Sequence, residues 1–168
     1  MYRHILIPTD GSELAEHGLA HGLALAKSLG AKVSVIFVVE PLSEIRRGPP
    51  FLEALTQYAE LRKEQVTSVL EHAANAAKEA GVSCKTIQVE NGQPHQGIIA
   101  AAEDRGCDLI VMSSHGRSGL SMLLIGSVTN KVLTFAKKNP RTGVSVKVQT
   151  ARCQSDVLLL SQGTWRLP

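Results

Sequence analysis

Residues 109–133 have the sequence LIVMSSHGRSGLSMLLIGSVTNKVL, and the prediction of the fold starts from them. The apolar run at its beginning, residues 109–112, predicts a buried strand. A loop of small residues follows, and Gly126-Ser127 then introduces a helix for which Ser127 is the predicted N-cap. Glycine lets the backbone approach a ligand, and a helix N-terminus presents unpaired N–H groups that suit a phosphate. The stretch therefore favours a phosphate site, with an ordinary strand–loop–helix connection as the alternative.

The segments around this stretch repeat the alternation of strand and helix. The run at residues 33–39 is nearly all apolar, as in a parallel sheet that is buried on both faces. The run at residues 82–89 is less apolar, which predicts a strand near the edge of the sheet. Repeated strand–helix units predict an α/β fold with helices on both faces. The predicted strands are residues 4–7, 33–39, 82–89, 109–112 and an alternating segment at 144–148, and the predicted helices begin after Ser12, near Leu55, at Pro94 and after Ser127.

Composition limits the classes of function. The chain has 168 residues, 43% of them hydrophobic and 20% charged, which is typical of one soluble globular domain. The net charge of +3 is mild and aromatic residues make up 4%, so nucleic-acid binding is not indicated. No signal peptide is expected, and no apolar run approaches the ~20 residues of a membrane span. Three cysteines without a C-x-x-C pair, Cys84, Cys107 and Cys153, predict free thiols in a reducing cytoplasm, with Cys107 serving in packing.

Two polar loops follow predicted strands, at residues 8–12 and at residues 113–127. In open α/β sheets, ligands bind beyond the carboxyl ends of the strands, so these loops share one crevice if their two strands are neighbours. Asp10 in the first loop has a second interpretation, because Asp-Gly-Ser is also a common turn and helix start. The second loop has neither a P-loop lysine nor a carboxylate, which predicts binding with slow or absent hydrolysis.

The glycine loop resembles the nucleotide loop of the universal stress protein family. The pattern in the ATP-binding members of that family is G-x2-G-x9-G-[S/T]. Gly116, nine further residues and Gly126-Ser127 match the second and third elements of the pattern, and Ser113 stands in place of the first glycine. Serine is also small, which is compatible with the same loop shape.

The resemblance extends from Tyr2 to about Lys137. It implies a universal stress protein domain over residues 1–149, followed by a C-terminal extension of residues 150–168. The implied fold is an α/β, open, parallel, five-stranded sheet with helices on both faces, Rossmann-like and similar to the adenine nucleotide alpha hydrolases. We interpret the extension as loosely ordered. Its apolar segment at residues 157–160 has packing on a partner as the alternative.

The resemblance also implies a ligand, ATP, accompanied by Mg²⁺ or Mn²⁺. It implies that Asp10 accepts hydrogen bonds from the ribose hydroxyls and that Val38 touches the adenine. The backbone N–H groups of the glycine loop and the Ser127 hydroxyl are implied to hold the phosphates. No catalytic residue and no protein ligand for a metal ion are expected. The implied binding residues are Pro8, Thr9, Asp10, Val38, Met112, Ser113, His115, Gly116, Arg117, Gly119, Gly126, Ser127 and Val128.

The function implied by the resemblance is that of a cytoplasmic, ATP-binding stress-response protein that acts on other proteins through nucleotide-dependent contacts. A homodimer is also implied, since the last strand pairs across the dimer in many members. Neither nucleic acid nor membrane insertion is expected. Ser113 leaves open a protein-interaction module of the same fold that binds no nucleotide. An adenylating enzyme is the least supported alternative, because no nucleophile or acid–base pair stands out.

The histidines suggest one further site. Glu13, His17 and His21 fall on one face of the first predicted helix and have the residue types that bind zinc, but a solvated helix face is the favoured interpretation. His72 and His95 are isolated in the sequence, and we interpret both as surface residues.

Overall fold

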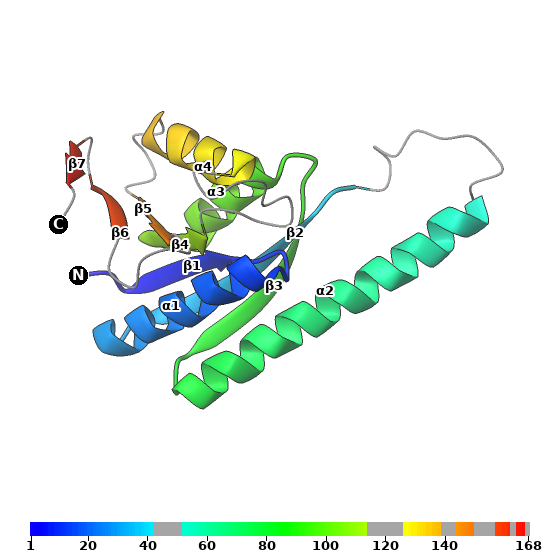
Figure 1. Cartoon of the computed structure of the whole chain (residues 1–168), viewed down its shortest axis with the longest axis horizontal. Helices are drawn as coiled ribbons and strands as arrows, with labels where there is room; N and C mark the ends of the chain where they lie inside the picture. Colours follow the sequence, from blue (N-terminus) through cyan, green and yellow to red (C-terminus); the bar gives the residue numbers. More distant parts are fainter. Residues whose placement is uncertain (42–51, 114–125, 139–143, 150–156, 162–163, 167–168) are drawn as a thin grey trace.

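The chain forms one sheet with helices on both of its faces (Figure 1). This computed structural model describes residues 1–41, 52–113, 126–138, 144–149, 157–161 and 164–166. The elements in chain order are β1 (His4–Pro8), α1 (Glu13–Leu29), β2 (Lys32–Val39), α2 (Leu52–Ala80), β3 (Cys84–Glu90), α3 (Pro94–Asp104), β4 (Leu109–Ser113), α4 (Ser127–Lys138), β5 (Ser145–Gln149), β6 (Val157–Ser161) and β7 (Thr164–Arg166).

The strand order is β3-β2-β1-β4-β5-β6-β7. The first five of these strands are parallel, which confirms the predicted open α/β sheet, and β3 lies at its edge as expected. Ile5 of β1 lies opposite Val33 of β2 on one side and opposite Leu109 of β4 on the other. The chain winds outward from β1 to β2 and β3, and in the opposite direction through β4 and β5. The carboxyl ends of β1 and β4 therefore form a switch point, where ligands bind in such sheets.

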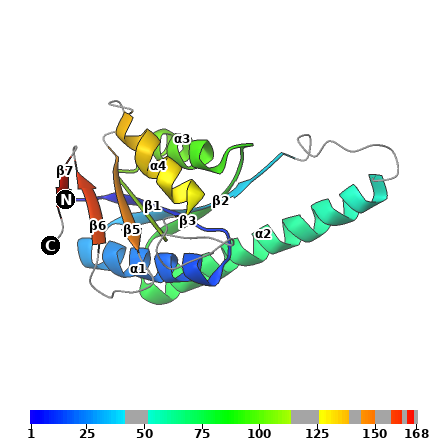
Figure 2. The same ribbon diagram turned by 45° about the horizontal axis from the view of Figure 1, so that its top comes forward.

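The sheet separates two hydrophobic cores, and Figure 2 shows the helix layers on either side of it. Ile5 and Ile7 of β1 pack toward α1 and α2, whereas Leu6 between them packs toward α3 and α4. All three side chains are fully buried. Burial of an aliphatic side chain contributes about 1.5–3 kcal/mol, so these alternating contacts hold both helix layers on β1. No helix in the described ranges combines the length and hydrophobicity needed to cross a bilayer.

Helix α1 begins and ends where the sequence predicts. The Ser12 hydroxyl accepts a hydrogen bond from the N–H of Ala15 at 3.2 Å, which satisfies one of the unpaired donors of the first turn. At the other end Gly30 has a φ of 64°, a left-handed conformation that glycine adopts without steric cost. These caps fix α1 directly after the polar loop that follows β1.

His95 is buried, so its interpretation as a surface residue is wrong. Its ring lies 5.3 Å from the ring of Phe135, centroid to centroid, where the first turn of α3 packs beside α4. The contact joins residues that are far apart in sequence, and no local pattern predicts it. Cys107 is buried as expected, and burial together with the charge of Asp108 raises the pKa of its thiol to about 11. The thiol is therefore protonated at neutral pH and inert in packing.

The described residues of the C-terminal extension, 157–161 and 164–166, form strands β6 and β7, in place of the expected loose order. Strand β6 pairs antiparallel with β5, with Leu159 opposite Lys147, and β7 pairs antiparallel with β6. The outer edge of β5 offers unpaired backbone N–H and C=O groups, and an extended segment that reaches this edge satisfies them. The sequence alone does not show which sheet edge is within reach of the extension.

Removal of residues 150–168 is expected to make the chain self-associate, because it uncovers the edge of β5. Light scattering coupled to size-exclusion chromatography measures the mass of the full chain and of the truncated chain. We expect a larger assembly for the truncated chain, and circular dichroism should show that its helix content is retained. Equal masses at equal concentration, with both chains folded, would contradict this role of the extension.

The stability of the fold is expected to fall in mild acid because of His4. Its Nε2 lies 2.9 Å from the Ser34 hydroxyl and its Nδ1 lies 3.1 Å from the Arg105 carbonyl. Burial, aided by the charge of Lys32, lowers the pKa of this imidazole below its ordinary value of 6.5. The unfolded chain therefore binds the proton more tightly. The stabilisation is complete above the unfolded pKa and is lost as the pH falls through the folded one.

Urea unfolding at about pH 7.5 and about pH 5 tests this expectation, since histidine is the side chain that ordinarily titrates in that interval. The free energy of unfolding should be lower at the acidic pH. A His4→Gln variant, which takes up no proton, should show a flatter pH dependence. The same slope in both proteins would exclude His4 as its source.

Candidate functional site

A cleft of about 520 Å³ lies at the carboxyl ends of β1, β2 and β4. It is at the predicted crevice, because β1 and β4 are parallel neighbours, and Asp10 after β1 and Ser113 at the end of β4 both line it. His115, Gly116, Arg117 and Gly119 lie outside the described residues. The other predicted binding residues all line this cleft, namely Pro8, Thr9, Asp10, Val38, Met112, Ser113, Gly126, Ser127 and Val128.

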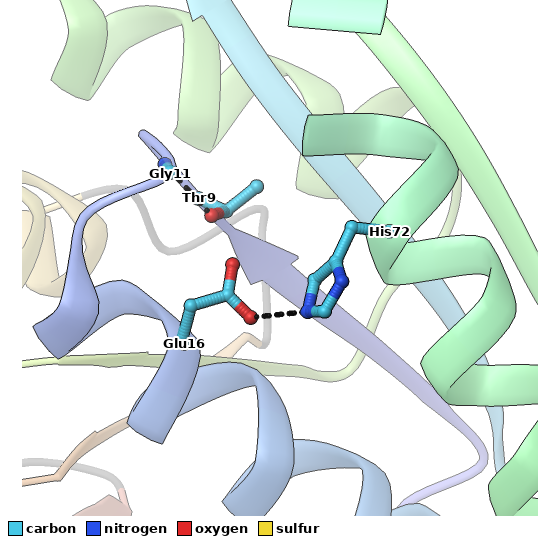
Figure 3. A network of polar contacts seen from close by, with 4 residues as sticks. All are labelled: Thr9, Gly11, Glu16 and His72. Carbon is cyan, nitrogen blue, oxygen red and sulfur yellow. Dashed lines mark hydrogen bonds and ion pairs between the residues drawn. The ribbon is translucent and has the colours of Figure 1, made fainter. Parts of the chain in front are cut away.

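The loop after β1 is held by one backbone hydrogen bond to β2 and by hydrogen bonds to its own side chains. The N–H of Thr9 donates to the Ile36 carbonyl at 2.9 Å, which extends the β1–β2 pairing by one residue. The Thr9 hydroxyl accepts from the N–H of Gly11 at 3.2 Å (Figure 3). Oδ1 of Asp10 accepts from the N–H of Ser12 at 3.1 Å. Asp10 therefore has the turn role that its sequence context suggests, while its carboxylate, with about four lone-pair positions, also lines the cleft.

Two glycines bring helices close to the cleft. Gly11 has a φ of +74°, and a Cβ at this position would lie 2.6 Å from Cγ2 of Val69 in α2. A Cβ on Gly18 of α1 would lie 3.1 Å from the backbone nitrogen of Ser113 at the end of β4. A polar contact between Glu16 and His72, 2.9 Å between Oε2 and Nε2, joins α1 and α2 beside the first of these contacts (Figure 3). Close packing against α2 and α1 therefore holds in place the loop after β1 and the end of β4, which both line the cleft.

The end of β4 and the beginning of α4 form the opposite side of the cleft. Helix α4 starts at Ser127, and the Gly126 carbonyl already accepts the first helical hydrogen bond, from the N–H of Asn130 at 2.9 Å. Gly126 therefore holds the N-cap position, and the prediction of Ser127 as N-cap is wrong by one residue. The first N–H groups of a helix have no partner within the helix and carry partial positive charge, which suits an anion.

Thr129 was missed by the sequence prediction. Its hydroxyl donates to the carbonyl of Ser113 at 3.0 Å, and the residue is buried and lines the cleft. This bond ties the first turn of α4 to the end of β4. A threonine in a first helical turn has many roles, so the sequence gives no signal that selects this partner.

A second missed group lies on α2. Tyr58, Leu61, Arg62 and Gln65 line the cleft, and Glu40 after β2 lies with them. The four helix residues are spaced i, i+3, i+4 and i+7, the spacing of one helix face. That spacing is a signal in the sequence, but it does not show what the face is directed toward.

The histidines of α1 form no metal site. No three His, Cys, Asp or Glu side chains in the described ranges lie close enough together to hold a metal ion, so the zinc alternative for Glu13, His17 and His21 is wrong. His17 is exposed, whereas Nε2 of His21 is buried without a hydrogen-bond partner among the described residues. Burial, with the charge of Lys147 adding to it, lowers the pKa of His21 and favours its neutral form. His72 is exposed, as expected of a surface residue.

Comparisons of the sequence and of the structure with known proteins both match members of one protein family. The sequence profile of the Universal stress protein family matches residues 1–139. Universal stress protein MJ0531 of Methanocaldococcus jannaschii is 35% identical over 136 residues, which cover 81% of this chain and 78% of that protein. Universal stress protein YxiE of Bacillus subtilis is 34% identical over 140 residues, with coverage of 79% and 92%.

Solved structures of this family have the same fold. The structure of MJ0577 superposes with a TM-score of 0.69 and 31% identity, covering 89% of this chain and 98% of that one. A universal stress protein in complex with cAMP gives a TM-score of 0.63 at 22% identity, with coverage of 88% and 97%. A match over most of the chain, with relatives above 30% identity, shows the family. This chain belongs to the universal stress protein family.

Proposed function

We propose that the cleft binds an adenine nucleotide, ATP in particular with Mg²⁺ or Mn²⁺, and that bound nucleotide controls contacts with partner proteins. The observation that carries the proposal is the gathering of Asp10, Val38 and Ser127, from three separate segments, in one cleft at the switch point of the sheet. Its volume of about 520 Å³ is within the range of small-molecule sites.

Each end of the cleft suits a different part of a nucleotide. The beginning of α4, from Gly126 to Val128, supplies backbone N–H groups and partial positive charge for the phosphates. We assign the Asp10 carboxylate, which also lines the cleft, to the ribose, whose hydroxyls can donate hydrogen bonds to a carboxylate. Val38 and Ile98 supply apolar surface at the β2 end, where a base is the part of the ligand that gains from burial.

The family relationship supports this choice of ligand. Universal stress proteins of the same fold have been solved with cAMP, at 22% identity, and with dAMP, at 18% identity and a TM-score of 0.57. Both of those ligands are adenine nucleotides. From these relatives we extend the ligand class to this chain, whereas the choice of ATP rests on the pattern of the glycine loop.

We propose binding with slow or absent turnover. The acidic side chains among the described residues that line the cleft are Asp10 and Glu40. Asp10 is assigned to the ribose, and Glu40 follows β2, away from the beginning of α4. The sequence from residue 113 to 127 contains no carboxylate that could activate water beside the phosphates. The free thiols of Cys84 and Cys107 are consistent with the proposed cytoplasmic location.

The nucleotide content of freshly purified protein tests the proposal. Heat release followed by anion-exchange chromatography should give an adenine nucleotide, and added ATP should yield little phosphate. A preparation that contains no nucleotide and does not bind added ATP would favour the interaction module without nucleotide, the alternative that Ser113 leaves open. Release of pyrophosphate on addition of a carboxylic acid would instead favour an adenylating enzyme.

A further inference from the structure

The N-terminal half of α2 has an apolar face that the sheet does not cover. The C-terminal half packs on the sheet through Ala73 and Ala77, which are buried in the same core as the side chains of β1 and β2. The N-terminal half extends beyond the sheet (Figures 1 and 2). There Tyr58 is 47% exposed and Leu61 is 66% exposed, although both line the cleft. Exposed apolar side chains that line a cleft offer surface that a ligand in the cleft can cover.

Tyr58 and Arg62 form an ordered pair on this face. The guanidinium carbon of Arg62 lies 5.8 Å from the centroid of the Tyr58 ring, within the range of a cation–π contact. Nη1 of Arg62 also donates a long hydrogen bond to the Tyr58 hydroxyl, at 3.4 Å. Each side chain is planar at its end, and each restrains the other. The pair therefore loses less conformational entropy on meeting a flat ligand than two free side chains would.

The order of the strands puts the pair on the β2 side of the cleft, away from the beginning of α4. Helix α2 packs on β2 and β3, and its Val69 contacts Gly11 directly after Asp10. Going toward the N-terminus from Val69, the helix passes the loop after β1 and then presents Arg62 and Tyr58. Val38 and Glu40 of the β2 end line the same cleft. The beginning of α4 lies on the other side of β1, beyond the end of β4.

We propose that Tyr58 and Arg62 form the outer wall of the base site and stack on the face of the adenine that Val38 leaves open. The inference rests on the proposed function and adds to it a specific part of α2 as a determinant of nucleotide affinity. A phenol ring and a guanidinium both stack on the π-face of a base. The wall contacts the base and not the phosphates, so its contribution is independent of the number of phosphates.

Calorimetric titration with Mg-ATP and with AMP tests this wall. Tyr58→Ala and Arg62→Ala should each weaken binding about tenfold, and by the same factor for both nucleotides. Lys63→Ala is the matched control, because it removes the same charge from the next residue of α2, which is exposed and does not line the cleft. We expect Lys63→Ala to bind as the unmodified protein does. Arg62→Lys keeps the charge but not the planar group, and should resemble Arg62→Ala.

A fluorescent analogue gives a second readout that depends on stacking. The base of 1,N6-etheno-ATP bound to the unmodified protein should be shielded from acrylamide, and Tyr58→Ala should expose it to the quencher. A loss in Arg62→Ala that is larger for ATP than for AMP would assign Arg62 to the phosphates and overturn the proposal. Unchanged affinity and shielding in both alanine variants would overturn it as well.

The outcomes separate this inference from the proposed function. If Asp10→Ala loses the nucleotide while Tyr58→Ala and Arg62→Ala retain it, the wall is wrong and the nucleotide site stands. If the folded, unmodified protein binds no nucleotide, the site and its wall are both wrong. Circular dichroism of each variant should show that α2 remains helical.

Discussion

Alanine in place of Asp10 is expected to weaken the binding of Mg-ATP about a hundredfold, because a hydrogen bond to a charged group contributes about 1.5–3 kcal/mol. The carboxylate lines the cleft between the end of β2 and the beginning of α4, where the ribose of a bound nucleotide would lie. Calorimetric titration measures the loss. The effect should be almost as large for AMP, since the ribose is common to both ligands.

The Asp10→Asn variant separates the ribose contact from the turn. Asparagine keeps an oxygen that can accept the hydrogen bond from the N–H of Ser12, now 3.1 Å from Oδ1 of Asp10. It removes the negative charge that strengthens bonds to the ribose hydroxyls. We expect weakened binding and a normal unfolding midpoint. Full affinity in both Asp10 variants would contradict the assignment of this residue to the ribose.

Alanine in place of Gly11 is expected to lower the free energy of unfolding by about 2–4 kcal/mol, through a left-handed backbone and a steric clash. The φ of +74° disfavours any residue with a Cβ, and the added Cβ would lie 2.6 Å from Cγ2 of Val69. The side chain of valine is stiff at χ1 and cannot turn aside cheaply in a helix. Helix α2 would therefore have to move away from the loop. Urea unfolding monitored by circular dichroism measures the loss.

A double variant divides this loss into its two causes. Adding Val69→Ala to Gly11→Ala removes the clash but leaves the backbone strain, so the double variant should be more stable than the sum of the two single changes predicts. Strict additivity would show that α2 and the loop are not coupled at this contact. A Gly11→Ala protein as stable as the unmodified chain would contradict the close packing itself.

The order of the elements could be predicted because it depends on local signals. Apolar runs mark the strands, and Ser12 and Gly30 mark the ends of α1 as the structure has them. The neighbourhood of β1 and β4 followed from the resemblance to the family, and it brings the loop of Asp10 and the end of β4 into one cleft. Ser127 was misplaced by one residue, because a glycine at an N-cap has no side chain by which the sequence could identify it.

Contacts between residues that are far apart in the sequence could not be predicted from the sequence alone. The side-chain spacing of Tyr58, Arg62 and their neighbours indicates a helix face, but its direction depends on how far α2 extends past the sheet. The burial of His95 depends on Phe135 in another helix. The pairing of β6 depends on the free edge of β5, which appears only when the whole sheet is assembled.

Calorimetric titration of the nucleotide-free protein with Mg-ATP shows whether this cleft is a nucleotide site. We predict a saturable heat at a ratio near one nucleotide per chain, lost in Asp10→Ala, weakened in Arg62→Ala and unchanged in Lys63→Ala. Circular dichroism should first show that the protein has an intact α/β fold. If such protein then gives no binding heat at several temperatures, the cleft is not a nucleotide site.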